Sequence, residues 1–345
     1  MSKNDDVSFT LTNEFLSIEI DPNQGADLVS LMHRESGEEL LWRDPRTSAR
    51  SGTAPLPMFA DSFYDTYRGG MQELFPNTAD SSVVMGVTLP FHGEACQLAW
   101  SVRREHRYGS DRLVCMTDLT RYPVRMERTI SLVPGEPTLR IRSEIVNLSA
   151  RALPYTWAMH PAFSRAVTAE PSVLYAPFAC AVSHPDKFSE NQSFAPGEVV
   201  GGGSVEGVST LTLNANDAGT TDLLYAQPDQ GWYTLRNESS GLTVSMGWPV
   251  EQFPELWIWQ ECRGVGDFPW WGQHHIVAVE PHVASPSRAL AEHIVAGTAR
   301  ELAPHGRLSA EFTLSAELTS LDQIPQGLDT RGRVVLRQKE KEHTA

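Results

Sequence analysis

One histidine and one glutamate lie at points of the sequence where general acid–base chemistry is possible. His160 ends the apolar stretch LPYTWAM and precedes Pro161. Proline lacks a backbone N–H and favours an extended backbone in the residue before it. We therefore expect His160 at the end of a strand, at the rim of a sheet. A rim histidine is either an ordinary surface residue or a proton donor, because imidazole titrates near neutral pH.

Glu280 closes the segment HIVAVE, residues 275–280, in which both faces of the expected strand are apolar. Its carboxylate should therefore be partly desolvated. Desolvation raises the pKa of a carboxyl group and makes the ionised form a stronger base. Two interpretations remain open for Glu280, a general base or one half of a strand-end ion pair.

Three other sequence features could contact a ligand. His92 precedes Gly93 in a turn that permits close approach of the backbone, and Arg68 precedes two glycines that allow a tight loop. An arginine there can donate a forked pair of hydrogen bonds to sugar oxygens. Trp270 and Trp271, in CRGVGDFPWWGQHH, either stack on the apolar face of a sugar or pack as a lid.

The remaining histidines and the cysteines give only weak indications of a metal site or of redox chemistry. His274, His275 and His282 are possible metal ligands by type, but their spacing is not helical, so we expect no metal. The four cysteines contain no CxxC pair, which indicates reduced thiols; they are Cys96, Cys115, Cys180 and Cys262.

The elements that must position these side chains are mostly strands, because apolar and polar residues alternate with a period of two. Strands are expected at residues 15–20, 96–102, 124–133, 138–146, 242–248, 255–260, 275–280 and 307–315. The best helix candidate covers 285–297, with Ser285 as N-cap, Pro286 in the first position and Gly297 as the stop. The sequence predicts an all-β fold, a large antiparallel β-sandwich with few short helices.

Length and composition limit the remaining possibilities. The 345 residues, 41% hydrophobic and 21% charged, indicate an ordinary globular protein. We expect a single domain over residues 1–318, followed by a frayed, polar and basic C-terminal tail over 319–345. The net charge of −15 disfavours nucleic acid as a partner, and no apolar run is long enough to span a membrane. The charged start, MSKNDDVSF, favours a cytoplasmic location. A monomer or homodimer is expected.

Taken in order, these segments resemble the galactose mutarotase and aldose 1-epimerase family over about residues 10–318. The most specific stretch runs from Ile145 to Phe163 and is similar to the family pattern N-x-S … P … W-x-x-H-P-x-F. The other matching segments are a Gly-Gly loop ending in LFPN, then FHG, then VEP, and finally ELAPHGRLSAEF.

The resemblance implies a mutarotase-type β-sandwich and an isomerase without a cofactor, which exchanges the α and β anomers of a small-molecule sugar. It assigns His160 as the acid that protonates the ring oxygen and Glu280 as the base that takes the anomeric hydroxyl proton. It also implies that His92 and Asp222 bind sugar oxygens. With these roles, the acidic limb of a pH–rate profile is expected from Glu280 and the alkaline limb from His160.

Arg68 resembles an arginine of the branch that acts on hexose 6-phosphates. However, Glu73 replaces a residue that is usually apolar in that branch, and the sequence contains no second arginine cluster for a phosphate. We therefore expect a free aldose. The alternatives are a hexose-6-phosphate 1-epimerase, a non-catalytic sugar-binding or sensing protein on the same fold, and an accessory sandwich of a polysaccharide-degrading enzyme.

Overall fold

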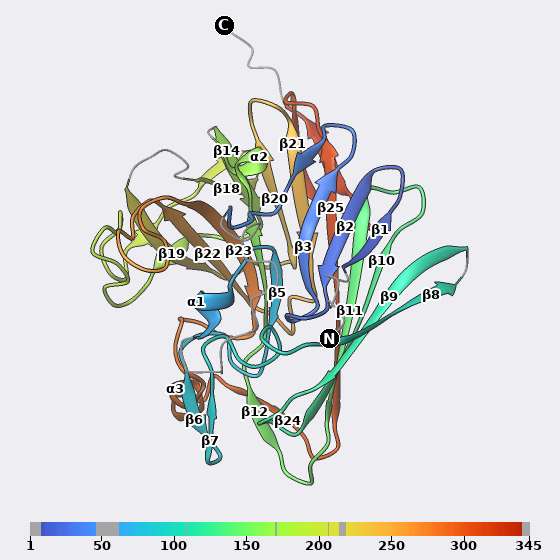
Figure 1. Cartoon of the computed structure of the whole chain (residues 1–345). Helices are drawn as coiled ribbons and strands as arrows, with labels where there is room; N and C mark the ends of the chain where they lie inside the picture. Colours follow the sequence, from blue (N-terminus) through green and yellow to red (C-terminus); the bar gives the residue numbers. More distant parts are fainter. Residues whose placement is uncertain are drawn as a thin grey trace, which may run out of the picture.

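Two large antiparallel sheets pack face to face in the computed structural model (Figure 1). The structure describes residues 8–45, 62–107, 109–169, 171–205, 207–213 and 219–339. Apolar side chains from both sheets form one core between them, for example Ile18 from the first sheet and Ile141 from the second. The predicted all-β sandwich is confirmed.

The first sheet has eleven strands. In spatial order they are β1 (Phe9–Thr12), β2 (Leu16–Asp21), β3 (Asp27–His33), β5 (Met71–Leu74), β13 (Ala158–Phe163), β23 (His275–His282), β22 (Glu255–Cys262), β19 (Thr220–Ala226), β15 (Ala181–Ser183) and β16 (Val199–Val200), while β4 (Glu38–Glu39) pairs with β3. Strands β5, β13, β23 and β22 lie in the middle of this order and carry the candidate site.

The second sheet has ten strands, and three short strand pairs lie outside both sheets. The second sheet contains β17 (Gly203–Val205), β18 (Val208–Thr212), β14 (Ser172–Ala176), β20 (Trp232–Asn237), β21 (Leu242–Gly247), β25 (Arg307–Leu318), β11 (Thr138–Asn147), β10 (Val124–Leu132), β9 (Ser110–Asp118) and β8 (Ser101–Arg107). The short pairs are β6 (Ser82–Val84) with β7 (Val87–Leu89), β12 (Leu153–Tyr155) with β24 (Arg300–Leu302), and β26 (Gln323–Leu328) with β27 (Val334–Gln338).

The alternating sequence pattern determines which face each strand buries. In the pairing of β10 with β11, Met126 lies opposite Ile145 and Ile130 lies opposite Ile141, so the apolar residues of both strands face the core. Of the predicted strands, only the one at residues 96–102 is largely wrong. Residues 94–98 form turns instead, in which Gln97 N–H donates to the carbonyl of Glu94, and the strand begins at Ser101.

A buried ion pair joins the two sheets inside this core. Glu73 of β5 accepts hydrogen bonds from Arg128 Nε of β10 at 2.7 Å, Ser143 Oγ of β11 at 2.9 Å and Trp157 Nε1 at 2.9 Å. Glu73 and Arg128 are almost fully buried. The acidic residue that is unusual for the phosphosugar branch therefore points between the sheets and has a structural role.

Helices are few and short: α1 (Ser62–Thr66), α2 (Arg165–Thr168) and α3 (Leu290–Ala296). Gly297 ends α3 with a left-handed backbone, as predicted, but the predicted start at Ser285 is wrong. Ser285 Oγ instead donates to Glu255, and Ser287 N–H donates to the Tyr225 hydroxyl, so these residues tie the loop to the first sheet. None of the described helices has the length and apolar character to cross a membrane.

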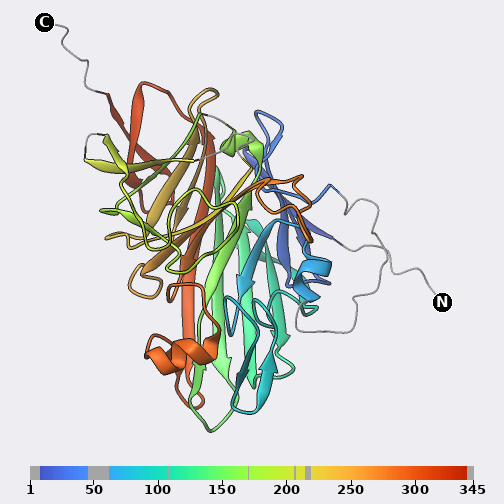
Figure 2. The same cartoon turned by 90° about the vertical axis from the view of Figure 1, so that its left-hand side faces the viewer.

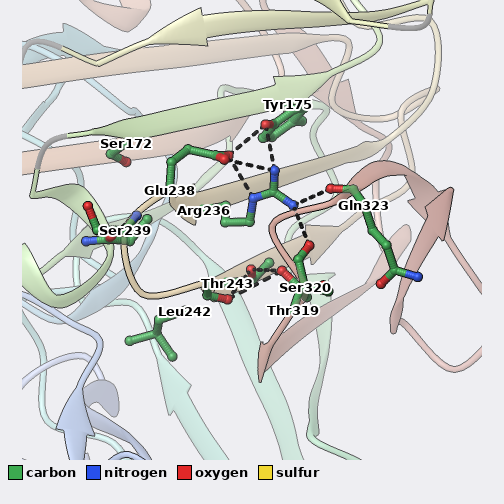
Figure 3. A network of polar contacts seen from close by, with 12 residues as sticks. Ser172, Tyr175, Arg236, Glu238, Ser239, Leu242, Thr243, Thr319, Ser320 and Gln323 are labelled. Carbon is green, nitrogen blue, oxygen red and sulfur yellow. Dashed lines mark hydrogen bonds and ion pairs between the residues drawn. The ribbon is translucent and has the colours of Figure 1, made fainter. Parts of the chain in front are cut away.

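The prediction of a frayed tail is wrong for residues 323–338, which form the β26–β27 hairpin at the end of the molecule opposite α3 (Figure 2). Figure 3 shows how Arg236 of β20 holds this segment. Its guanidinium binds both carboxylate oxygens of Glu238 and the Tyr175 hydroxyl, and it donates to the backbone carbonyl of Gln323 at 2.7 Å. Residues 340–345 lie outside the described part of the chain.

Candidate active site

The pairing of β13 with β23 places the two predicted catalytic residues opposite each other. Ala158 lies opposite His282 and Ala162 lies opposite Ala278. Counting inward from these two pairs, His160 faces Glu280 across the strands. Side chains alternate along a strand, so both residues project from the same face of the sheet, the one turned away from the intersheet core.

The resulting contact is short and buried. His160 Nε2 lies 3.5 Å from Glu280 Oε1. The two residues are only 5% and 3% exposed, respectively. Because Ala158, Ala162 and Ala278 are small, the side chains of His160 and Glu280 have room above the sheet. The prediction that His160 ends its strand at a sheet rim is wrong, since β13 continues through Pro161 to Phe163 in the middle of the sheet.

Pro161 is tolerated at this position because the hydrogen-bonding ladder is interrupted there. Strands β13 and β23 pair at Ala158 and again from Ala162, but not at the three residues between them. Pro161 has no N–H to donate, so an uninterrupted ladder would leave an acceptor on the facing strand unpaired. The same proline that suggested a strand end therefore marks a local opening next to His160.

His92 joins the pair from the loop between β7 and β8. Its ring centroid lies 5.5 Å from that of His160. Its Nδ1 lies 2.8 Å from the backbone carbonyl of Thr78, so Nδ1 carries the hydrogen and Nε2 is left as an acceptor. Gly93 allows this turn: its φ is +76°, and a Cβ there would lie 2.3 Å from the carbonyl oxygen of Phe75.

Burial controls the charge of these groups. Desolvation raises the pKa of the Glu280 carboxyl well above its ordinary value and lowers the pKa of His160 to about 4. Burial also lowers the pKa of His92, and the proximity of His160 lowers it further. Burial therefore disfavours the charged forms of both groups, the ionised Glu280 carboxylate and the protonated His160 imidazole.

Aromatic side chains surround the pair. Tyr67 and Trp259 have ring centroids 6.2 Å from that of His160. Trp270, in the loop between β22 and β23, packs against Trp259 at 5.6 Å and against Tyr67 at 5.9 Å. Trp271 points outward and is 53% exposed. The predicted tryptophan pair is thus divided: Trp270 covers the site, whereas Trp271 offers a free aromatic face.

The structure does not bring two of the predicted sugar-binding residues to the His160–Glu280 pair. Asp222 occupies a position of β19 that shares its face with Leu224, which belongs to the intersheet core. Its carboxylate accepts hydrogen bonds from the backbone N–H and the hydroxyl of Ser193 at 2.6 and 2.7 Å. Arg68 forms an ion pair with Asp21 of β2 at 3.3 Å.

Some residues of the site were missed from the sequence. Tyr67, Trp257 and Trp259 were not singled out, and His282 was considered only as a possible metal ligand. The period of two would have found His282, because it follows Glu280 by two residues and so shares its face. Among the described residues, no group of three or more His, Cys, Asp and Glu side chains is arranged to hold a metal ion.

With this geometry established, comparisons place the chain among known proteins. Residues 8–316 match the model of a family described as a domain of unknown function (DUF4432). No protein with a curated description matches the sequence.

Solved structures match the fold over nearly the whole chain. The Slr1438 protein of Synechocystis sp. PCC 6803 is 18% identical with a TM-score of 0.67, covering 92% of this chain and 98% of that one. A galactose mutarotase-like protein of Lactobacillus casei is 18% identical with a TM-score of 0.61, covering 90% and 100%. A galactose mutarotase related enzyme of Lactobacillus acidophilus is 17% identical with a TM-score of 0.63, covering 90% and 97%. Because these identities are low, the similarity establishes only the fold of this chain, which is galactose mutarotase-like.

Proposed function

The chain belongs to the DUF4432 family, and from its paired acid and base we propose that it interconverts the α and β anomers of an unphosphorylated aldose. The observation that carries the proposal is the 3.5 Å contact between His160 Nε2 and Glu280 Oε1. Anomer exchange needs one group that removes the C1 hydroxyl proton and one that protonates the ring oxygen. Both oxygens are bonded to C1, so adjacent side chains can reach them together.

The proton count of the pair matches the reaction. In the reactive form Glu280 is ionised and His160 is protonated. Glu280 takes the proton from the C1 hydroxyl as His160 gives one to the ring oxygen, and the bond between C1 and the ring oxygen breaks. The aldehyde forms while Glu280 is protonated and His160 is neutral. Rotation about the bond from C1 to C2 and the reverse transfers close the ring as the other anomer.

The surroundings of the pair support a neutral sugar as the substrate. Neutral His92 offers Nε2 as an acceptor for a hydroxyl, and the covering rings of Tyr67, Trp259 and Trp270 provide apolar surface for the C–H face of a sugar. Arg68, the cation that suggested a phosphosugar, is held by Asp21. Because His160 and Glu280 are almost fully buried, the sugar must displace part of this aromatic cover to contact both.

The direct test is anomer exchange measured with fresh single-anomer aldoses and sugar phosphates, by polarimetry, for the wild type and for Glu280→Gln. The amide keeps the size and an acceptor oxygen but cannot take a proton. We expect the exchange rate constant to fall by about two to four orders of magnitude, the usual effect of losing a positioned proton acceptor. Sugar affinity and melting temperature should change little.

Two outcomes would contradict the proposal. A well-folded Glu280→Gln protein that retains more than about a tenth of wild-type turnover would remove Glu280 from the mechanism. Turnover restricted to hexose 6-phosphates, with that preference lost in Arg68→Ala, would favour the phosphosugar reaction.

A second candidate function is sugar binding without catalysis, and the low pKa of His160 favours it, because it disfavours the protonated imidazole that would transfer a proton to the ring oxygen. Saturable sugar binding by calorimetry, together with exchange rates equal to the buffer blank, would establish this alternative.

A further inference from the structure

His282 makes a direct contact with the proposed base. Its Nε2 lies 2.8 Å from Glu280 Oε2, whereas Oε1, the other carboxylate oxygen, is the one that faces His160. His282 and Glu280 are two residues apart on β23, so both project from the same face of the sheet. The two oxygens of the carboxylate therefore have different partners.

The ring of His282 is fixed in its orientation. It stacks on Trp257 of β22 with ring centroids 3.6 Å apart and an angle of 6° between the planes. Trp257 Nε1 in turn donates to the carbonyl of Ala284 at 3.2 Å, so the stacking partner is itself held. His282 is 0% exposed. A buried ring pressed flat against another ring cannot rotate away from the carboxylate.

The unpaired ring nitrogen identifies the tautomer. Nδ1 of His282 is buried and has no hydrogen-bond partner among the described residues. A neutral imidazole has one N–H and one bare nitrogen, and leaving a buried N–H unpaired is costly. The hydrogen is therefore on Nε2, which donates to Glu280 Oε2. Burial supports the neutral form, because it lowers the pKa of His282 well below its ordinary value.

We propose that His282 is a positioning residue, which holds the Glu280 carboxylate through its Nε2–H so that Oε1 faces the sugar and His160. This inference rests on the proposed anomer exchange. A hydrogen bond to the ionised carboxylate favours that form, so it makes an ionised base possible inside an otherwise desolvating site. Trp257 contributes by clamping the donor ring, as a buried supporting shell does for other catalytic groups.

Other titratable groups around His282 come from several elements. Glu255 of β22 lies opposite it in the strand register, but that carboxylate is held by Gln227 and Ser285. Three more histidines would lower the pKa of His282 further if they were charged: His160 of β13, His92 of the loop before β8 and His293 of α3. All three are histidines whose pKa burial lowers, so they are neutral near pH 7 and leave the contact with Glu280 unchanged.

Two variants separate the donor from the ring. His282→Phe keeps an aromatic ring against Trp257 and removes the N–H, whereas His282→Gln loses the stacking but keeps an N–H donor. His33→Phe is the matched control, because His33 is also buried in the first sheet but hydrogen-bonds Ser36, away from the site. All proteins are first compared by circular dichroism and melting temperature.

The readouts are the exchange rate constant across pH and the titration of Glu280, followed by NMR with glutamate labelled at the side-chain carboxyl carbon. In His282→Phe we expect the Glu280 pKa to rise by about one pH unit and turnover to fall by about tenfold to a hundredfold, because a hydrogen bond to a charged group is worth about that factor. The Michaelis constant should be unchanged. His282→Gln should recover part of the loss, and His33→Phe should match the wild type.

A failure of the proposed anomer exchange can be told apart from a failure of the positioning role of His282. If wild-type protein accelerates no anomer exchange, the proposed function fails, and the role of His282 falls with it. If the wild type is active and folded His282→Phe keeps its turnover and the wild-type titration of Glu280, only the positioning role is overturned. A loss of turnover in His282→Phe without any shift of the Glu280 titration would also overturn it, because the donor would not be acting on the carboxylate.

Discussion

At the scale of single residues, Glu280 and His160 share one proton because burial penalises both of their charged forms. With the pKa of Glu280 raised and that of His160 lowered, the most populated one-proton form in the free protein is the neutral one. The reactive form, with Glu280 ionised and His160 protonated, contains the same number of protons. The pH dependence of the reaction therefore reports the pair as a unit.

Because the pair reacts with one proton, the assignment of the two limbs of the pH–rate profile is the reverse of the one expected from the sequence. Below a pH of about 4 the pair takes up a second proton, at His160, and no base remains. Above the raised pKa of Glu280 the pair loses its only proton, and no acid remains. We expect kcat/KM to be flat between these two pKa values, with a limb on the acidic side near pH 4 from His160 and a limb at higher pH from Glu280.

The profile is measured with buffer catalysis subtracted. An acidic limb centred near pH 6.5, the ordinary value for histidine, would contradict the lowered pKa of His160. A rate independent of pH over the whole range in which the protein is folded would contradict acid–base work by this pair.

At the scale of elements, the C-terminal hairpin shows how a polar segment becomes part of the fold. Its apolar contact is small, with Ile324 buried against Tyr175 and Trp232 of the second sheet. Arg236 adds the polar attachment, because its fully buried guanidinium binds Glu238, Tyr175 and the backbone of the hairpin. A guanidinium has five N–H donors, so it can serve these partners together.

Arg236→Met should therefore loosen the hairpin. Removal of the cation leaves the Glu238 carboxylate without its counter-charge, with only the Tyr175 hydroxyl still donating to it, and we expect a loss of about 3 kcal/mol in the free energy of unfolding. Backbone hydrogen exchange in residues 323–338 should increase most, and the exchange of β13 and β23 should change least. Arg333→Met, which removes the pairs of a half-exposed guanidinium with Glu317 and Glu136, is the comparison and should increase exchange in the hairpin less. Unchanged exchange in Arg236→Met would mean that the Arg236 guanidinium does not hold the hairpin.

At the scale of the whole molecule, the two sheets are joined by a buried charge pair as well as by apolar packing. Arg128 reaches from β10 across the core to Glu73 of β5 and donates to the carbonyl of Ala26 at 3.0 Å. Its guanidinium also lies over the Trp100 ring, 4.8 Å from the centroid. Such a pair adds little net stability compared with apolar residues, but removal of one member leaves an uncompensated buried charge.

Arg128→Met should consequently destabilise the fold by about 3–5 kcal/mol, measured by urea unfolding. Arg125→Met is a close control, because Arg125 lies on the same strand and its pair with Asp118 is exposed. That variant should unfold almost like the wild type. If both variants unfold like the wild type, the buried pair does not stabilise the assembly of the two sheets.

The sequence alone determined the class of fold and the identities of the main chemical groups. A period of two over segments such as residues 124–133 allows only half-buried strands, and this local property does not depend on pairing partners. Glu280, His160 and His92 were also found from sequence, because their motifs are local and resemble a known family. A weakly apolar, charged segment such as residues 319–345 gives no such local signal, so the hairpin was missed.

The tertiary structure decided which of these groups meet. Register between β13 and β23 places His160 opposite Glu280, and register is a property of two strands far apart in the sequence. The face of a strand also decides function: Asp222 has a suitable side chain, but its position on β19 turns it away from the site. Protonation depends on tertiary structure for the same reason, because desolvation comes from the aromatic residues that the fold packs around the pair.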